Sequence, residues 1–342
     1  MVGCVIVHDR KIIAEGLHQK FGGAHAEIEA LQKLETVPEN ATLYVTLEPC
    51  CHHGKTPPCS EAIIKSGIKR VVIAMRDPFP KVAGGGIREL ESAGIKISVG
   101  CLEKEAHELN APYLMRIENQ RPWILAKWAM TLDGKIAARN GSSYWISSEA
   151  SRKIVHRIRG RMDAIMIGSN TARLDDPQLT VRPPGIRTPI SIVWDSKATL
   201  NPESKLACSA NDSLVIAAVG PYADEKNITR LRKKGCEVLV LPEKDYLERF
   251  LSFFKNLADR GVTNLLAEGG GTLLGHLFDQ KLIDECHIFI APKLAGGQNA
   301  PSPLEGLGVE KMMDAVPLNR LNIRQIENDI YIHGRMQYAA QR

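Results

Sequence analysis

The sequence LEPCCHHGKTPPC occupies residues 47–59, downstream of the triplet HAE at residues 25–27. The spacing of apolar residues predicts that the histidine directly precedes a helix, that the first cysteine follows a strand, and that the last cysteine begins another helix. Imidazole and thiolate groups are zinc ligands, and three of them leave a fourth tetrahedral position for water. The pattern therefore predicts a catalytic zinc site on His25, Cys50 and Cys59.

Glu27 lies two positions after the histidine, where zinc-dependent nucleobase deaminases place a glutamate that is not a ligand. Because zinc lowers the pKa of bound water toward neutrality, a neighbouring carboxylate can carry the proton to the leaving amine. The usual motif has its second cysteine three positions after the first. Here that position is His53, so the second thiolate must come from Cys59 across a longer insert. On the residues alone an alternative stays open, in which Cys50 and Cys51 are ordinary buried thiols.

The second half of the chain carries its own motifs. They are LAKWAMTLDGK at residues 125–135, SYWIS at 143–147, GSNT at 168–171, LDDPQLTVR at 174–182 and EGGGT at 268–272. None is a GxGxxG loop after a first strand, so the ordinary dinucleotide-binding fold is disfavoured. Ser169 to Thr171 and Gly269 to Gly271 each follow a predicted buried strand, where hydroxyl and backbone N–H groups bind phosphate. We interpret the similar Gly84-Gly85-Gly86 as a plain turn.

The composition bounds the class of protein. The 342 residues suffice for two domains of about 150 residues each. Hydrophobic residues make up 44% and charged residues 24%, which excludes disordered, collagen-like and coiled-coil chains. No apolar run reaches the ~18 to 20 residues of a membrane helix, and we identify neither a signal peptide nor an anchor. The eight cysteines are too few for a disulfide scaffold, so we expect a reducing cytoplasm.

The net charge of +5 lies entirely in the second half of the chain. Residues 1–117 hold 14 basic and 14 acidic side chains, so the whole excess belongs to residues 118–342. A first domain without net positive charge lacks the basic surface with which proteins bind a polynucleotide. We therefore expect small-molecule substrates, no nucleic-acid partner and no membrane partner, and we leave open a homo-oligomer.

Short strands alternate with helices, which predicts α/β domains on largely parallel sheets. The first domain is predicted to contain strands at 2–7, 11–15, 42–47, 70–75 and 96–99, with helices at 26–34, 60–65, 86–93 and 103–114. The second is predicted to contain strands at 123–128, 164–167, 190–194, 214–217, 237–241, 264–267 and 285–290, helices at 148–161, 224–233, 247–259 and 271–278, and a closing antiparallel hairpin of 320–326 and 330–336. The polar stretch 116–122 separates domains 1–117 and 118–342. Because nothing precedes strand 2–7 to cover it, we expect a further segment upstream of Met1.

Both motif sets resemble one family, in the family's own order and over essentially the whole chain. LEPCCHHGKTPPC with HAE and the strand VGCVIV (residues 2–7) resembles the first domain of the bifunctional riboflavin-biosynthesis deaminase/reductases. LDG, SxxWI, DDPQLTVR and EGGGTL, in that order, resemble the reductase domain of the same family. The resemblance implies a cytidine-deaminase-like αβα domain followed by a dihydrofolate-reductase-like α/β domain. Members of the family carry a helix and a Pro-Asn-Pro segment before VGCVIV, and an asparagine where Phe79 stands here.

The resemblance also implies the roles of individual residues. It places zinc on His25, Cys50 and Cys59, with Glu27 as the proton shuttle, and it assigns substrate contacts in the first domain to His52, Lys55 and Thr56. It places NADPH against Ala129, Trp145, Thr171, Asp175, Ser196, Gly270, Gly271 and Thr272, within a segment that runs on to His276. It assigns substrate contacts in the second domain to Ser143, Arg159, Leu179, Arg182 and Glu268. Arg159 and Arg182 suit a phosphate because a guanidinium group binds such oxygens in pairs. Lys127 and Glu268 form the polar pair expected near the reacting sugar carbon.

The implied function is two successive reactions of riboflavin biosynthesis. The first domain would hydrolytically deaminate 2,5-diamino-6-ribosylamino-4(3H)-pyrimidinone 5′-phosphate. The second would use NADPH to reduce the ribosyl group of 5-amino-6-(5-phosphoribosylamino)uracil to ribityl. Two alternatives stay open: a working reductase with an impaired, structural deaminase domain, and a cytidine-deaminase relative that acts on nucleic acid.

Overall fold

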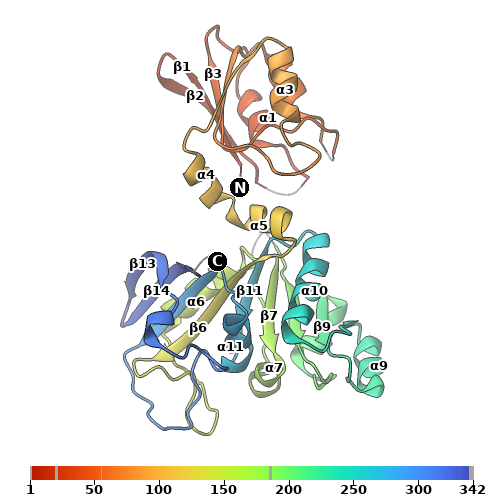
Figure 1. Ribbon diagram of the computed structural model, residues 1–342, viewed down its shortest axis with the longest axis vertical. Coiled ribbons are helices and arrows are strands. Elements are labelled where there is room, and N and C mark those ends of the chain that lie inside the picture. The colour runs from red at the N-terminus through yellow and green to blue at the C-terminus, as the bar shows by residue number, and fades with distance from the viewer. Residues whose placement is uncertain (1, 20–21, 55, 185–186, 339–342) are drawn as a thin grey trace. The chain divides into compact units, whose positions relative to one another are not determined.

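The computed structural model describes residues 2–19, 22–54, 56–184 and 187–338, and the chain divides into two compact units, Met1–Asn119 and Gln120–Arg342 (Figure 1). Helix α5 (Ala111–Asn119) closes the first unit, so the division lies two residues beyond the predicted one. The sequence predicts one helix over 103–114, whereas the structure has two, α4 (Glu103–Leu109) and α5, divided at Asn110. Helix α5 continues past Leu114 through Arg116 and Glu118. Both residues are good helix formers, and the next proline is Pro122.

The first unit is built on a five-stranded sheet in the order β2-β1-β3-β4-β5. Its strands are β1 (Gly3–His8), β2 (Lys11–Leu17), β3 (Thr42–Val45), β4 (Arg70–Ile73) and β5 (Lys96–Val99). β1 pairs antiparallel with β2 and β3, whereas β3, β4 and β5 run parallel. Three helices, α1 (Ala26–Leu31), α2 (Cys59–Ser66) and α3 (Gly85–Ser92), bury their apolar sides in one core with alternate strand residues such as Ile6, Leu43 and Ile73.

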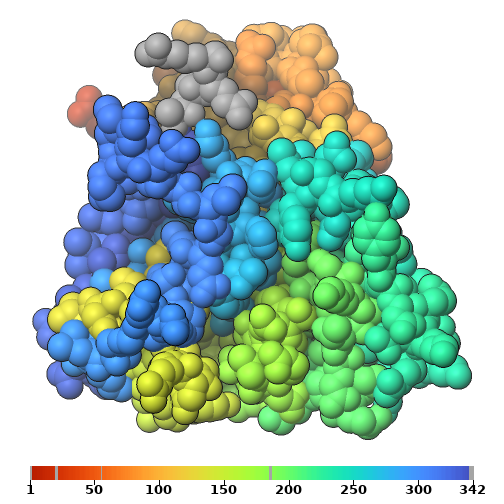
Figure 2. Space-filling model, turned by 60° about the horizontal axis from the view of Figure 1, so that its bottom comes forward, coloured from red at the N-terminus to blue at the C-terminus, as the bar shows by residue number. Residues whose placement is uncertain are grey.

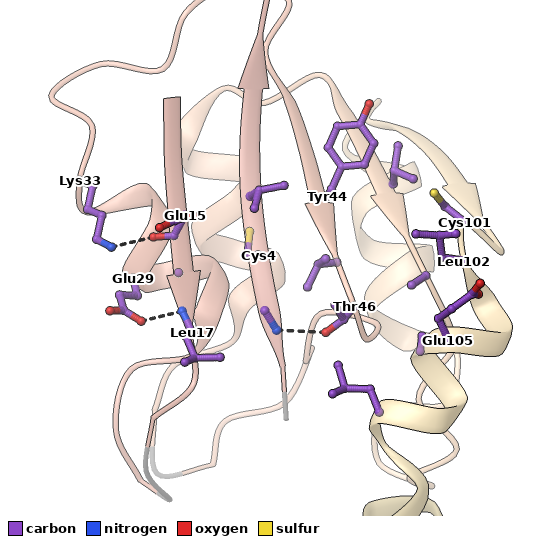
Figure 3. Close-up of a pocket in the computed structure, with 18 residues that line it drawn as sticks. Cys4, Glu15, Leu17, Glu29, Lys33, Tyr44, Thr46, Cys101, Leu102 and Glu105 are labelled. Carbon is purple, nitrogen blue, oxygen red and sulfur yellow. Dashed lines mark hydrogen bonds between the residues drawn. The ribbon is translucent and has the colours of Figure 1, made fainter. Parts of the chain in front are cut away.

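The opposite face of this sheet carries an apolar groove. Strand alternation sends Val5, Tyr44 and Val72 to this face, where helix α4 (Glu103–Leu109) and the preceding Leu102 cover part of it. Together these side chains line a groove of about 590 Å³ (Figure 3). Strand β1 is thus packed against the core on one face and borders the groove on the other.

The second unit is built on a nine-stranded sheet in the order β10-β9-β8-β7-β11-β6-β12-β14-β13. Its strands are β6 (Trp123–Thr131), β7 (Ala164–Gly168), β8 (Ile190–Trp194), β9 (Val215–Val219), β10 (Glu237–Val240), β11 (Asn264–Glu268), β12 (Glu285–Ala291), β13 (Leu318–Ile326) and β14 (Asp329–Met336). Neighbours from β10 to β12 are parallel, and β14 runs antiparallel to β12 and β13, which confirms the predicted closing hairpin. The carboxyl ends of the parallel strands meet at one edge, where ligands of such sheets bind.

Helices cover both faces of the larger sheet. α10 (Tyr246–Asp259) and α11 (Gly271–Asp279) pack in one core, and α7 (Ser169–Asp175), α8 (Lys205–Cys208) and α9 (Glu225–Lys233) pack in the other, while α6 (Glu149–Arg159) packs on β12 and β14. The sequence did not predict α7 or α8, because periodicity needs a window of roughly 11 to 18 residues. In the described part of the chain, no helix has both the length and the apolar character of a membrane span.

Two loops of the second unit lie side by side, one after β6 and one after β12, coloured yellow and blue in Figure 2. The Leu132 N–H donates to the Lys293 carbonyl at 2.8 Å. Asp133 accepts hydrogen bonds from the backbone N–H groups of Ala295 (3.1 Å) and Gly296 (2.7 Å). The aspartate of the LDG motif therefore ties the two loops together.

Candidate active sites

The three predicted zinc ligands meet in the structure although they belong to different elements. His25 precedes α1, Cys50 follows β3, and Cys59 is the first residue of α2. His25 Nδ1 lies 3.2 Å from Cys59 Sγ and 3.5 Å from Cys50 Sγ, and the three ligand atoms all lie within 4.8 Å of one another. Ligand atoms around a tetrahedral zinc are separated by roughly 3.3 to 3.8 Å, given bond lengths of about 2.0 to 2.3 Å. The three side chains therefore fit one zinc ion.

Hydrogen bonds within this triad favour the thiolate form of Cys50. The bond to the Cys59 thiol is the main reason why the pKa of Cys50 is lowered, to about 4. The same bond, followed by burial, raises the pKa of Cys59. The backbone N–H of Cys59 also donates to Cys50 Sγ at 3.4 Å, at the positive end of α2. The pair therefore holds one negative charge, and a bound Zn²⁺ would neutralise it and deprotonate the second thiol.

Glu27 is buried in the first turn of α1, with 3% of its surface exposed. Burial raises the pKa of its carboxyl group, and the nearby Cys50 raises it further, whereas a hydrogen bond with Cys59 partly opposes the shift. A carboxyl group whose pKa moves toward neutrality can accept a proton and return it. The position and the chemistry of Glu27 suit the predicted proton shuttle.

The insert between the two cysteines contains the predicted substrate contacts. His52 is partly buried, and its Nδ1 has no hydrogen-bond partner among the described residues. Its ring lies 6.0 Å from the ring of Phe79, which occupies the position where the resemblance leads us to expect an asparagine. Thr56 is partly buried, and Lys55 lies outside the described residues. An unpartnered imidazole nitrogen leaves His52 available for a ligand.

The three glycines interpreted as a plain turn lie where a turn enters α3: Gly84 is the last turn residue, and Gly85 and Gly86 are the first two residues of the helix, which was predicted to begin at Gly86. Gly84 takes a left-handed conformation as the N-cap, with φ +78°. A Cβ atom on Gly86 would lie 2.0 Å from the carbonyl oxygen of Pro49, so glycine is needed for α3 to pack on the ligand segment. Cys51 Sγ contacts the Lys81 carbonyl at 3.8 Å and is not part of the ligand triad.

Two side chains near the triad were missed by the sequence analysis. The ring of His18 lies 5.1 Å from the ring of His25, edge to face. Glu48 is buried and accepts hydrogen bonds from three backbone N–H groups. His18 has no local signal in the sequence, whereas Glu48 stands inside the LEPC motif and could have been singled out there.

In the second unit, the predicted polar pair lies on neighbouring strands. Lys127 on β6 stands opposite Glu268 on β11 in the parallel register. Arg159, the last residue of α6, donates from Nε and Nη2 to the two oxygens of Glu268 at 2.6 and 2.7 Å. The structure thus brings together three predicted residues in one charged cluster.

The pKa values of Lys127 and Glu268 are both lowered, for different physical reasons. Burial lowers the pKa of Lys127. Burial alone would raise the pKa of Glu268, but the charge and hydrogen bonds of Arg159, together with the charge of Lys127, outweigh it and lower that pKa to about 2. At neutral pH Glu268 is therefore ionised and has no proton to give, whereas Lys127 can release one.

The two arginines predicted as phosphate forks already have partners within the protein. Besides Glu268, Arg159 reaches the carbonyl of Thr180 from Nη1 at 3.3 Å. In this structure the guanidinium group of Arg159 is therefore occupied by Glu268 and is not free to bind a phosphate. The pairing is expected, because a buried carboxylate needs a charged partner. Arg182 donates to Gln178 Oε1 at 2.5 Å and to Thr180 Oγ1 at 3.3 Å, but it is exposed and can reach a phosphate.

The predicted phosphate cradles after β7 and β11 adjoin each other. The Gly270 N–H donates to Thr171 Oγ1 at 3.0 Å, and a Cβ atom on Gly270 would meet only that oxygen, at 3.5 Å. The site thus has room where a dinucleotide phosphate is expected. Gly271 serves packing instead, since its Cβ would lie 2.2 Å from the Ser302 carbonyl oxygen.

The other residues predicted to contact NADPH or the sugar are distributed around this edge and its loops. Ala129 lies on β6, Asp175 ends α7, Ser196 follows β8, Trp145 and Ser143 lie in the loop after β6, and Leu179 follows α7. Burial raises the pKa of Asp175, and Ser196 accepts a hydrogen bond from Arg249 at 3.3 Å. Thr272 donates to Glu305 at 3.0 Å. Trp145 is 61% exposed and stacks under the guanidinium group of Arg152 at 4.2 Å.

Comparison with known proteins gives a consistent result for both units. The cytidine and deoxycytidylate deaminase zinc-binding region matches residues 1–75, and the RibD C-terminal domain matches residues 122–332. The riboflavin biosynthesis protein RibD of Escherichia coli K12 is 37% identical over 97% of this chain and 92% of its own length. RibD of Actinobacillus pleuropneumoniae is 39% identical over 97% of this chain and 88% of its own length.

Solved structures agree with the sequence matches. Acinetobacter baumannii RibD, form 1, is 33% identical to this chain. The match covers 98% of this chain and 92% of the Acinetobacter chain, with a TM-score of 0.86. The diaminohydroxyphosphoribosylaminopyrimidine deaminase/5-amino-6-(5-phosphoribosylamino)uracil reductase of Thermotoga maritima is 32% identical over 98% of this chain and 92% of its own, with a TM-score of 0.82.

These matches confirm the predicted fold, a cytidine-deaminase-like αβα domain followed by a dihydrofolate-reductase-like α/β domain. They also confirm zinc and NADPH as the cofactors. Neither alternative function is favoured by them. The chain belongs to the RibD family, the bifunctional deaminase/reductases that act on small phosphoribosyl pyrimidines in riboflavin biosynthesis.

Proposed function

We propose that the two reactions are divided between residues 1–117 and residues 118–342. The first part deaminates 2,5-diamino-6-ribosylamino-4(3H)-pyrimidinone 5′-phosphate, and the second reduces 5-amino-6-(5-phosphoribosylamino)uracil to its ribityl product. The observation that carries this division is the presence of the ligand triad in one compact unit and of the Lys127–Glu268–Arg159 cluster in the other.

In the deaminase, His25, Cys50 and Cys59 hold the zinc ion, which supplies a reactive water at neutral pH when it is bound. Glu27, buried beside these ligands, would hold a proton and deliver it to the amine that leaves the pyrimidine. The burial that raises its pKa supports this role. His52, Thr56 and Lys55 bind the phosphorylated sugar, and the unpartnered Nδ1 of His52 supports that assignment.

In the reductase, NADPH would supply the hydride that reduces C1′ of the ribosyl group. Lys127 would give a proton to the ring oxygen released from C1′, so that the sugar ends as an open ribityl chain. The lowered pKa of Lys127 supports its role as the donor. Glu268, held by Arg159, keeps Lys127 in place. Arg182 binds the substrate phosphate, and Ser143 and Leu179 line the sugar site.

The cofactor residues proposed for NADPH share the carboxyl edge of the sheet and the loop after β6. They are Ala129, Trp145, Thr171, Asp175, Ser196, Gly270, Gly271 and Thr272. The bond that joins Thr171 to Gly270 supports a common phosphate cradle. A reducing cytoplasm is supported by the eight cysteines, all of which are free thiols. A homo-oligomer, and the expected lack of nucleic-acid and membrane partners, stay predictions.

Two substitutions test the division between the domains. Glu27→Gln should keep its zinc and lose deamination by roughly 10²- to 10⁴-fold, while it reduces separately supplied deaminated substrate at the normal rate. Lys127→Met should do the reverse. Both half-reactions are measured on each purified full-length variant, with zinc content determined alongside. A variant that loses both activities while folded would refute the division, and normal deamination by Glu27→Gln would refute the role of Glu27.

A further inference from the structure

Glu48 directly precedes the Pro49-Cys50 segment of the metal site, and only 3% of its surface is exposed. Its Oε2 accepts hydrogen bonds from the backbone N–H groups of Gly84 (3.1 Å) and Asp77 (3.3 Å), and its Oε1 accepts one from Ile87 (3.3 Å). Among the described residues it makes no ion pair within 4.0 Å. Backbone donors, two of them at the positive end of α3, therefore balance this buried charge.

The three donors lie at the two ends of one loop. Asp77 begins the loop soon after β4, and Gly84 and Ile87 lie where the loop enters α3. One carboxylate therefore closes the loop. Inside it, the Asp77 carboxylate accepts hydrogen bonds from the Phe79 N–H at 2.9 Å and from the Tyr113 hydroxyl at 2.8 Å.

The same loop forms a wall beside the proposed substrate contact. The Phe79 ring lies 6.0 Å from the ring of His52, the residue two positions after Cys50. The first turn of α3 also packs closely on the ligand segment. A Cβ atom on Gly86 would lie 2.0 Å from the Pro49 carbonyl oxygen, and one on Gly85 would lie 2.6 Å from Cys51 Sγ. A change in the position of the loop would therefore shift the wall relative to the metal ligand.

We propose that Glu48 is a positioning residue of the deaminase: it holds the loop of residues 77–87 against the segment that carries Cys50 and so fixes the spacing between the substrate wall and the zinc ion. This inference rests on the proposed zinc site. It requires a carboxylate, since two acceptor oxygens face three N–H donors. A residue that only filled space would be replaced without loss by glutamine, which has nearly the same shape.

The test is Glu48→Gln in the full-length chain. The amide would turn one of the two acceptors into a donor that faces backbone N–H groups. We expect zinc content and reductase turnover to stay at the wild-type level, and deaminase kcat/KM to fall roughly 10- to 100-fold, mainly through KM. Amide hydrogen exchange at Asp77, Gly84 and Ile87 should become faster. Glu91→Gln, which changes an exposed carboxylate of α3, is the matched control and should behave like the wild type.

Wild-type KM and exchange rates in Glu48→Gln would overturn the proposal. If that variant does not accumulate as a folded protein, Glu48→Asp decides the question, because it keeps the charge but shortens the reach. A zinc-loaded Glu48→Asp with a raised KM supports the positioning role, and one with an unchanged KM overturns it. Failure of the zinc site itself would be distinguished by Cys59→Ser, which would then keep its metal and its deaminase activity.

Discussion

Replacing Arg159 by methionine should destabilise the second unit by about 3 kcal/mol at pH 7. The Arg159 guanidinium donates two hydrogen bonds to Glu268 at 2.6 and 2.7 Å, and the two side chains are only 17% and 11% exposed. Methionine keeps the apolar stem but removes the charge. In the variant, Lys127 would be the one positively charged side chain of the Lys127–Glu268–Arg159 cluster that still faces the buried Glu268 carboxylate.

The magnitude follows from the pKa of Glu268. Its value of about 2 lies below the ordinary 4.5. At about 1.4 kcal/mol per pKa unit this difference corresponds to about 3 kcal/mol, which depends mainly on Arg159, the chief cause that lowers this pKa against the cost of burial. The folded-state pKa lies below the unfolded-state pKa. The stabilisation is therefore complete above about pH 4.5 and is lost as the pH falls toward about 2. The difference between wild type and variant should shrink to about 2 kcal/mol at about pH 3.5.

The assay is urea unfolding followed by tryptophan fluorescence. All four tryptophans, at positions 123, 128, 145 and 194, belong to the second unit, so the signal reports on that unit alone. The control is Arg157→Met, an exposed arginine on the same helix, which should change the free energy of unfolding by less than about 0.5 kcal/mol. A difference for Arg159→Met below about 1 kcal/mol at pH 7, or one that does not change between pH 7 and pH 3.5, would refute the reasoning.

Two further predictions concern the metal and the sugar phosphate. Cys59→Ser should lose its zinc, because Cys59 Sγ lies 3.2 Å from His25 Nδ1, whereas Cys51→Ser should keep about one zinc per chain by elemental analysis; the reverse result would mean that the wrong thiolate was chosen. Arg182→Ala should raise the KM for the phosphorylated sugar roughly 10- to 100-fold, since a charge-assisted bond contributes about 1.5 to 3 kcal/mol, with an unchanged Kd for NADPH. A weaker NADPH complex and a normal sugar KM would move this arginine to the cofactor.

The zinc site could be predicted from the sequence because its signals are local. Each ligand stands at the boundary of a periodic element, His25 before a helix, Cys50 after a strand and Cys59 at the start of the next helix. Long periodic elements were equally accessible: α10 was predicted over 247–259 and runs over Tyr246–Asp259, with Phe250 and Phe253 fully buried. The seven residues of α7 are too few to establish a period.

The glycines show where a local pattern misleads. Gly271 matched a phosphate cradle in the sequence, yet its lack of a side chain serves the packing of Ser302 and Glu305 on α11. The same holds for Gly86, which allows α3 to approach Pro49. A glycine that permits close approach looks the same in a sequence whether the approaching group is a ligand or another segment of the chain. The distinction requires the tertiary contact.

Buried carboxylates were the hardest to interpret, because the donors that fix their role come from remote segments. The backbone partners of Glu48 lie 29 to 39 residues away, and Glu268 lies 109 residues from Arg159. The resemblance therefore assigned both Arg159 and Glu268 to the substrate, and nothing in the sequence indicated that the two side chains pair with each other. The two carboxylates are also balanced differently. Glu48 faces backbone N–H groups, so a side chain with two acceptor oxygens fits there. Glu268 faces the charged side chains of Arg159 and Lys127, which lower its pKa, so its contribution to stability changes with pH. Glutamine should accordingly disturb geometry at position 48 and electrostatics at position 268.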